Sequence, residues 1–135
     1  MRFFLSVLFY LFLSHSSYTQ KHKADTSGLA GSWSGKSICQ VKSSPCNNEL
    51  VVYYITLGDK ENHYTITMNK IVNVKEEDMA VIPAVYTPAD HKLVGTMKNY
   101  PAWNFAVKGK TIDGHLLLPD GTIYRVIHVE KQIQK

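Results

Sequence analysis

Residues 49–72 read ELVVYYITLGDKENHYTITMNKIV, two stretches of β-branched and aromatic residues around a polar break. In the second stretch, Tyr64, Ile66 and Met68 alternate with Thr65 and Thr67, the period of two that is typical of a strand with one buried face. The break, GDKEN at 58–62, is short and rich in turn-forming residues. Strands joined by so short a connection pair antiparallel, so this segment predicts a β-hairpin.

The same pattern continues on both sides of this hairpin. Strands are predicted at 33–40, 49–57, 63–72, 79–86, 92–97, 102–108, 111–118 and 122–130. Pro83 predicts an edge or a bulge, and the breaks KGK (108–110) and PDGT (119–122) predict further turns. Lys75–Asp78 is expected to form a charged β-turn. No segment keeps helical periodicity over three turns, so the chain is predicted to be all-β.

Eight short antiparallel strands with hairpin links must protect their edges. Closure into a single eight-stranded up-and-down β-barrel does this, and the regular meander favours it over a two-sheet sandwich. A barrel of this size is either filled by side chains or holds one small ligand.

The N-terminus has the features of a secretory signal peptide. Arg2 is followed by the apolar run FFLSVLFYLFL (3–13) and then by small polar residues. The run is too short for a transmembrane helix. We therefore expect a signal peptide at 1–19, an N-terminal arm at 20–30, a barrel at 31–131 and a tail at 132–135. The mature chain is predicted to be secreted or periplasmic, with no membrane span.

The two cysteines, Cys39 and Cys46, enclose QVKSSP. An exported chain meets an oxidising compartment, so a structural disulfide is predicted. A metal pair is disfavoured because no histidine lies near them, and a redox pair normally has the spacing C-x-x-C.

The charge pattern argues against nucleic-acid binding. The chain has 15 Lys and Arg residues against 11 Asp and Glu residues, a formal net charge of +4. The lysines are scattered, and no five-residue basic run focuses them. We expect a solvated surface with no nucleic-acid partner.

Gly31-Ser32-Trp33 is similar to the G-x-W motif that opens the first strand of lipocalins and other calycins. The patterns W-x-G-x-S-I-C (33–39), S-P-C (44–46) and P-D-G-T-x-Y-R (119–125) resemble those of small exported bacterial lipocalin-like proteins of an uncharacterised family. The resemblance implies a calycin-like barrel that Trp33 closes at one end. It also implies that a basic residue of the last strand packs across the Trp33 ring, and Arg125 matches that position.

The sequence gives no support for an enzyme. It has no H-E-x-x-H motif, no phosphate-binding glycine loop and no nucleophile elbow at a strand-to-helix turn. His115 and His128 are expected to face each other across the last hairpin, as surface residues. We predict no catalytic residues, no metal site and no cofactor.

Three binding or structural roles are left open. The first is a carrier of a small apolar or amphipathic ligand. Its predicted lining is Tyr53, Tyr64, Ile66, Met68, Trp103, Phe105 and Tyr124. The second is a protein-binding module, such as a periplasmic protease inhibitor that inserts the arm QKHKADTSGLA (20–30) into its partner. The third is a filled structural barrel with no ligand.

Overall fold

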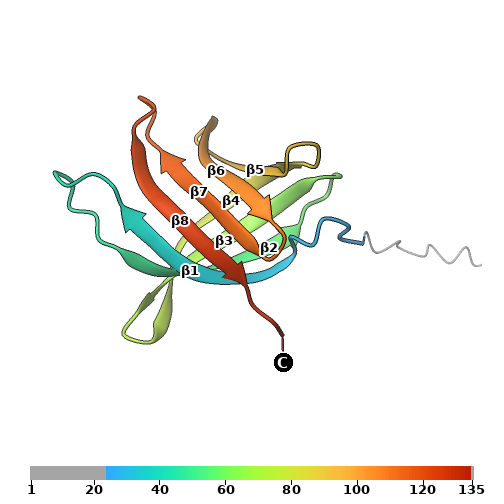
Figure 1. Cartoon of the computed structure of the whole chain (residues 1–135), viewed down its shortest axis with the longest axis horizontal. Helices are drawn as coiled ribbons and strands as arrows, with labels where there is room; N and C mark the ends of the chain where they lie inside the picture. The colour runs from blue at the N-terminus through green and yellow to red at the C-terminus, as the bar shows by residue number, and fades with distance from the viewer. Residues whose placement is uncertain (1–23, 135) are drawn as a thin grey trace, which may run out of the picture.

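The computed structural model describes residues 24–134, and their strands form one closed barrel (Figure 1). The strands are β1 (Gly31–Cys39), β2 (Glu49–Leu57), β3 (His63–Val72), β4 (Lys75–Thr87), β5 (Lys92–Met97), β6 (Tyr100–Lys108), β7 (Thr111–Leu117) and β8 (Ile123–Lys131). Each strand pairs antiparallel with the next, and β8 pairs antiparallel with β1. The predicted up-and-down barrel is therefore confirmed, and the sandwich alternative is wrong.

The predicted signal peptide and the first residues of the arm lie outside the described residues. Within 24–134, the structure contains no helix with the length and apolar character needed to cross a membrane.

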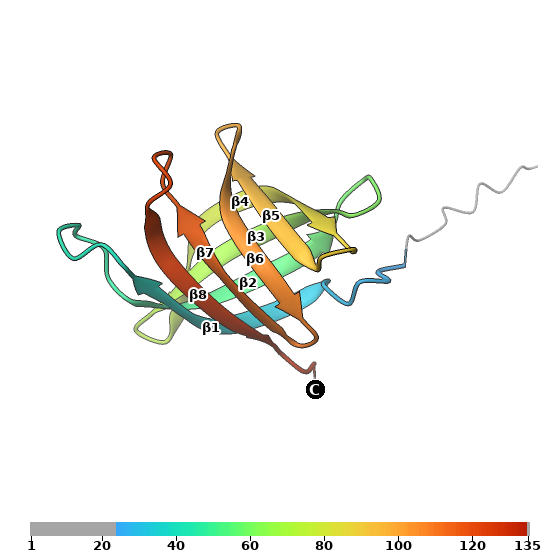
Figure 2. The same cartoon turned by 45° about the horizontal axis from the view of Figure 1, so that its top comes forward.

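The two ends of the barrel differ, and Figure 2 shows them on opposite sides of the molecule. Arm residues 24–30 and the C-terminal end of β8 lie at one end, which we call the plugged end. The loop 40–48 lies at the other end, which we call the disulfide end.

The barrel interior is filled by one continuous cluster of buried apolar side chains to which all eight strands contribute. Leu29 and Trp33, both with no exposed surface, belong to the plugged end of the cluster. Met97, Tyr100 and Leu116 are partly buried and pack against it at the disulfide end. Side chains on the inner face alternate with polar or exposed ones, as the period of two predicts.

Closure of the barrel depends on the approach of its first and last strands. Gly35 pairs with Val129, and a Cβ atom on Gly35 would lie 2.0 Å from the carbonyl oxygen of His128. Gly114 brings β7 equally close to β6, because its Cβ would lie 2.2 Å from the carbonyl oxygen of Asn104. Glycine is needed at such points because any side chain would overlap the neighbouring backbone.

The predicted turn at Lys75–Asp78 is wrong, because these residues continue β4. The turn lies at Asn73-Val74, where both residues have a positive φ, 51° and 68°. A two-residue hairpin of this kind matches the twist of the flanking strands. Val74 is an unusual residue there, since β-branched side chains disfavour this conformation, and its presence concealed the turn in the sequence. The edge predicted at Pro83 is confirmed, since pairing between β4 and β5 begins only at Ala84.

Cys39 and Cys46 form a disulfide with a Cα–Cα distance of 5.9 Å, as predicted. Arg125 Nη1 donates to the carbonyl oxygen of Asn47, the residue that follows Cys46, at 2.9 Å. The disulfide and Arg125 together hold the loop 40–48 against the seam between β1 and β8.

Replacing both cysteines, with Cys39→Ser and Cys46→Ser, should lower the free energy of unfolding by about 2–2.5 kcal/mol on the chain-entropy model of a closed eight-residue loop. The barrel should still fold, because its core is remote from the loop. Urea unfolding checks this, and the wild type in reducing agent should show the same loss. Free thiols in the untreated protein, or unchanged stability of the variant, would contradict it.

Candidate functional site: the two ends of the barrel

Trp33 closes the plugged end from inside. Its side chain is fully buried, and its indole Nε1 donates to the carbonyl oxygen of Leu29 at 2.9 Å. The Nζ of Lys131 lies 5.6 Å from the centre of the Trp33 ring and donates to the carbonyl oxygen of Gly28 at 2.5 Å. A cation over an indole face is attracted by the ring's electron density.

The prediction that Arg125 packs across Trp33 is wrong. In the register of β1 with β8, Trp33 lies opposite Lys131, whereas Arg125 lies opposite Cys39. The two basic residues therefore belong to opposite ends of the barrel. The position that the resemblance assigned to Arg125 is held by Lys131, because strand register rather than local motif decides which residue meets the ring.

The described part of the arm is bonded to the plugged end. One carboxylate oxygen of Asp25 accepts from the amide and hydroxyl of Ser27, at 3.1 and 2.6 Å, and from the Tyr64 hydroxyl at 3.1 Å. The other accepts from the amide of Ala30 at 2.7 Å. Residues 25–30 thus form a plug, with Leu29 inserted into the core. A free arm for insertion into a protease does not fit these residues.

The Asp25 carboxylate is stabilised in its charged form. Its partial burial acts to raise its pKa, but hydrogen bonds from Ser27, Ala30 and Tyr64 outweigh this and lower the pKa below its usual value. A folded-state pKa below the unfolded one contributes stability that is present above the unfolded value and is lost as the pH falls through the folded value.

We therefore expect the plug to loosen in acid. Between neutral pH and a pH below about 4, the usual range of an aspartate pKa, the amides of Leu29 and Ala30 should lose protection from hydrogen exchange. In the matched variant Asp25→Asn, protection should be lower at neutral pH and should not change further in acid. Equal protection of the wild type at both pH values would contradict the role given to Asp25.

At the disulfide end, Arg125 is the central polar residue. Its side chain is 11% exposed, and Nη1 lies 3.2 Å from the Ser37 hydroxyl and 3.4 Å from a carboxylate oxygen of Glu49. Its guanidinium carbon also lies 5.7 Å from the centre of the Tyr124 ring. These contacts fix a cation at the rim of the barrel.

An aromatic row lies inside the barrel below this rim. The Tyr53 and Phe105 rings meet edge to face at 6.3 Å, and Phe105 stacks with Trp103 at 6.1 Å. The register places Trp103 opposite Leu116 and Leu116 opposite Arg125, so the row and the cation are close to the same level of the barrel.

Two polar atoms of this row lack hydrogen-bond partners. The Tyr53 hydroxyl and the Trp103 Nε1 are buried and have no partner among the residues that the structure describes; a third such atom is Asn69 Oδ1. Buried polar atoms are nearly always paired with protein, water or ligand. Each of these two atoms is therefore expected to meet a water or a ligand.

Tyr53 keeps its proton under ordinary conditions. Burial raises the pKa of its hydroxyl well above the usual range; Arg125 partly offsets this, and Glu49 adds to it. The group is therefore a neutral donor or acceptor.

The structure brings together part of the predicted ligand lining. Tyr53, Trp103 and Phe105 meet in the aromatic row, and Ile66 and Met68 belong to the same core. Tyr64 lies at the other end, in the plug. Tyr124 lies outside the core cluster, half-buried beside Arg125, with its hydroxyl 3.1 Å from that of Ser44.

Several rim residues were not singled out from the sequence. These are Glu49, Met97, Tyr100 and Leu116, which come from four different strands. Arg125 was assigned to the wrong end. Its inward direction could have been predicted, since it alternates in step with Ile127 and Val129.

The histidines form no site in the barrel. His128 Nδ1 lies 2.5 Å from Asp113 Oδ1 on the exposed face, and this hydrogen bond raises the pKa of the imidazole. The expected pairing of His115 with His128 is wrong, since the register places His115 opposite Val126. Among residues 24–134, no group of three acidic, histidine or cysteine side chains is arranged to hold a metal ion.

Comparison with known family models, with curated proteins and with solved structures finds no match to this chain.

Proposed function

We propose that this protein is a binding protein rather than an enzyme, and that its disulfide end takes a small amphipathic molecule. The observation that carries the proposal is the pair of buried, unpartnered polar groups of Tyr53 and Trp103. The ligand would place an acceptor group near these donors and an apolar part along Phe105 and the partly buried Met97 and Leu116.

The energetics favour such a ligand. A buried polar group without a partner costs about 1–3 kcal/mol, so an acceptor that meets either donor recovers part of that cost. The fixed Arg125 cation at the rim makes the site more favourable for a carboxylate than for a neutral acceptor, although Glu49 offsets part of this field.

The ligand must be slender, because the interior is packed with side chains. Met68 and Met97 are the residues best able to adapt, since unbranched thioether side chains repack at low cost. A medium-length fatty acid fits this description, with its carboxylate toward the Tyr53 hydroxyl and Arg125 and its chain along Phe105, Met97 and Leu116.

Decanoate is the probe for this proposal, with decanol as the neutral comparison. Decanoate should quench tryptophan fluorescence with saturation. The variant Tyr53→Phe, which removes only the unpartnered hydroxyl, should weaken binding by about three- to tenfold, the range expected for one hydrogen bond. The same variant should leave the stability of the free protein unchanged or higher, because it removes an unsatisfied group.

Lys60→Ala, in the β2–β3 turn, is the surface control and should bind decanoate as the wild type does. If neither decanoate nor decanol binds with saturation, the two donors hold water and the barrel has a structural role.

We also propose that the protein acts outside the cytoplasm, as an extracellular or periplasmic protein of a bacterial lipocalin-like family. The disulfide supports this, because such bonds persist in oxidising compartments. The apolar run at 3–13 supports export. N-terminal sequencing of the exported protein tests it, and the expected first residue is Gln20 or one close to it.

A further inference from the structure

One strand of the barrel has an open edge. β4 is paired with β3 along its length but with β5 only over Ala84–Thr87. Among the described residues, no strand pairs with the other side of Lys75–Pro83. The Tyr86 amide donates to the Asn62 carbonyl oxygen, which lies on the β3 side of β4. Because the backbone N–H and C=O groups of successive strand residues point to opposite sides, those of Val81 point to the open side.

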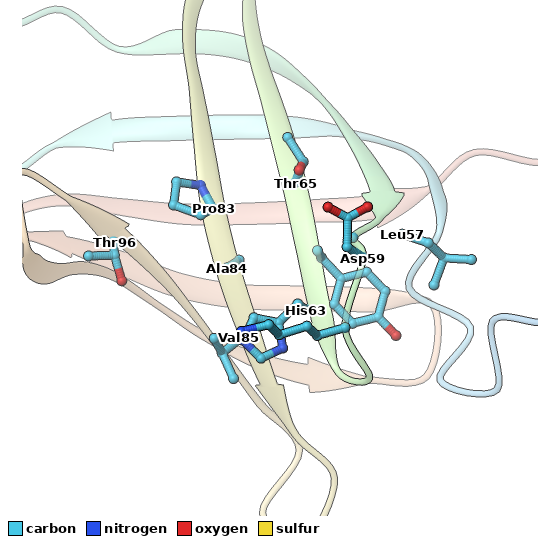
Figure 3. A pocket seen from close by; sticks show the side chains of 11 residues that line it. Leu57, Asp59, His63, Thr65, Pro83, Ala84, Val85 and Thr96 are labelled. Carbon is cyan, nitrogen blue, oxygen red and sulfur yellow. The ribbon is translucent and has the colours of Figure 1, made fainter. Parts of the chain in front are cut away.

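The open edge lies beside exposed apolar side chains on the outer face of the barrel. Val81 is 65% exposed, and Met79 and Val85 are also exposed. Where β4 and β5 part, the outer face has a shallow cavity of about 390 Å³ lined in part by Pro83, Val85 and Thr96 (Figure 3). An open strand edge with apolar neighbours is the usual surface for adding a further strand.

The other half of the edge is acidic. Lys75 is followed along β4 by Glu76, Glu77 and Asp78, and Glu77 pairs with Lys70 at 3.9 Å, so the edge keeps a net negative charge centred on Glu76 and Asp78. The Glu76 carboxylate is held in place by the Tyr54 hydroxyl, at 2.7 and 2.9 Å, and by the Asn69 amide at 3.0 Å. These hydrogen bonds, that of Asn69 first, lower the pKa of Glu76, so it is anionic at neutral pH. Asp78 has no ion-pair partner within residues 24–134.

The hairpin tip beyond this edge gives a second sign of a contact surface. Val74 is 97% exposed and has a φ of 68°. A β-branched residue in this conformation is unfavourable, and it makes no core contact in return. Residues kept at such a cost are often found where a protein meets a partner.

We propose that the open edge of β4, residues 75–83, binds an extended basic segment of a partner protein as an added strand. Basic side chains of the segment would lie opposite Glu76 and Asp78, and apolar ones beside Val81. This surface is on the outer face and does not depend on the ligand site in the interior.

A second copy of this chain fits the edge less well. If two β4 strands pair antiparallel about Met79, Glu76 lies opposite Ile82 and Asp78 opposite Ala80. Each carboxylate would then face an apolar residue, with no cation to balance it. A basic segment supplies that cation, which is why the charge pattern favours it.

The test uses the whole protein and an eight-residue peptide of alternating lysine and valine, with a glutamate–valine peptide for comparison. The lysine peptide should bind with saturation and at least about tenfold more tightly than the glutamate peptide, because like charges on paired strands are unfavourable. On binding, the amides of Asp78 and Val81 should gain protection from hydrogen exchange.

Two matched variants locate the contact. Val81→Lys places a cation on the open edge and should weaken binding of the lysine peptide by about tenfold or more. Val126→Lys adds the same charge at an exposed position of β8, which is paired on both sides, and should bind as the wild type does. Both positions are exposed, so both variants should melt like the wild type.

Three results would overturn the proposal. The first is no saturable binding of the lysine peptide to the wild type. The second is equal binding to Val81→Lys. The third is a dimer in sedimentation analysis that Val81→Lys dissociates, because the edge would then be occupied by a second copy.

Discussion

Trp33→Ala should lower the free energy of unfolding by about 3–5 kcal/mol, the usual cost of truncating a buried tryptophan. The expected loss is large because three features of the plugged end depend on this one side chain. It fills the end of the core, receives the cation of Lys131 and donates to the carbonyl oxygen of Leu29. A domain of this size has about 5–15 kcal/mol of stability in total, so the variant should melt far below the wild type.

Thermal and urea unfolding measure this loss, and Lys131→Ala is the informative comparison. Lys131→Ala should lower the free energy of unfolding much less, by about 0.5–2 kcal/mol, since it removes the cation over the ring and one exposed hydrogen bond to Gly28 but leaves the core filled. Arg125→Ala should leave the environment of Trp33 unchanged, as judged by the NMR signal of the Trp33 indole N–H. If Trp33→Ala melts within a few degrees of the wild type, Trp33 does not close the barrel.

Gly35→Ala adds a single methyl group and should lower the free energy of unfolding by about 3 kcal/mol or more. This is at or above the upper end of what overpacking usually costs. The added Cβ would lie 2.0 Å from the His128 carbonyl oxygen and 2.8 Å from the Val129 Cα. Both are backbone atoms of β8, so no side-chain rotation relieves the overlap. The variant must separate β1 from β8 at the seam that closes the barrel.

Gly109→Ala is the control for this prediction. A Cβ at Gly109 meets no atom within 4 Å, but the residue has a φ of 61°. Gly109→Ala should lower the free energy of unfolding only by the cost of placing alanine in this left-handed conformation, about 1–2 kcal/mol. Hydrogen exchange gives a second readout, since Gly35→Ala should expose the amides of Lys36 and His128, which face each other across the seam. If the two alanine variants are equally stable, the close approach of β1 and β8 does not limit closure.

The β-branched and aromatic residues of ELVVYYITL and the alternation in HYTITMNKIV were enough to predict β2 and β3 with their observed bounds. The turn predicted at Lys75–Asp78 was wrong because a run of charged residues is typical of a turn, whereas here it lies on the part of β4 that extends beyond β5. The turn at Asn73-Val74 was not predicted, since valine disfavours the positive φ that Val74 adopts.

Some of the candidate site was also visible in the sequence. Trp103 and Phe105 were predicted to face the interior by their period and Tyr53 as part of the ligand lining, and all three side chains are in the core. That two of them carry unpartnered polar atoms was not predictable, because it depends on what lies across the barrel from each side chain. Arg125 shows the same limit, since its partners Ser37, Asn47 and Glu49 come from the opposite part of the chain.

The sequence by itself determined the number of strands, their antiparallel order, the interior position of Trp33 and the pairing of the two cysteines. These depend on local alternation, on short connections and on a short separation between the cysteines, all of which can be read along the chain. The tertiary structure alone decided that Lys131 rather than Arg125 meets Trp33, that residues 25–30 plug one end, and that Lys75–Pro83 has an open edge. The physical reason is that each of these depends on register between strands, and a shift of two residues keeps the same face buried while changing every cross-strand neighbour.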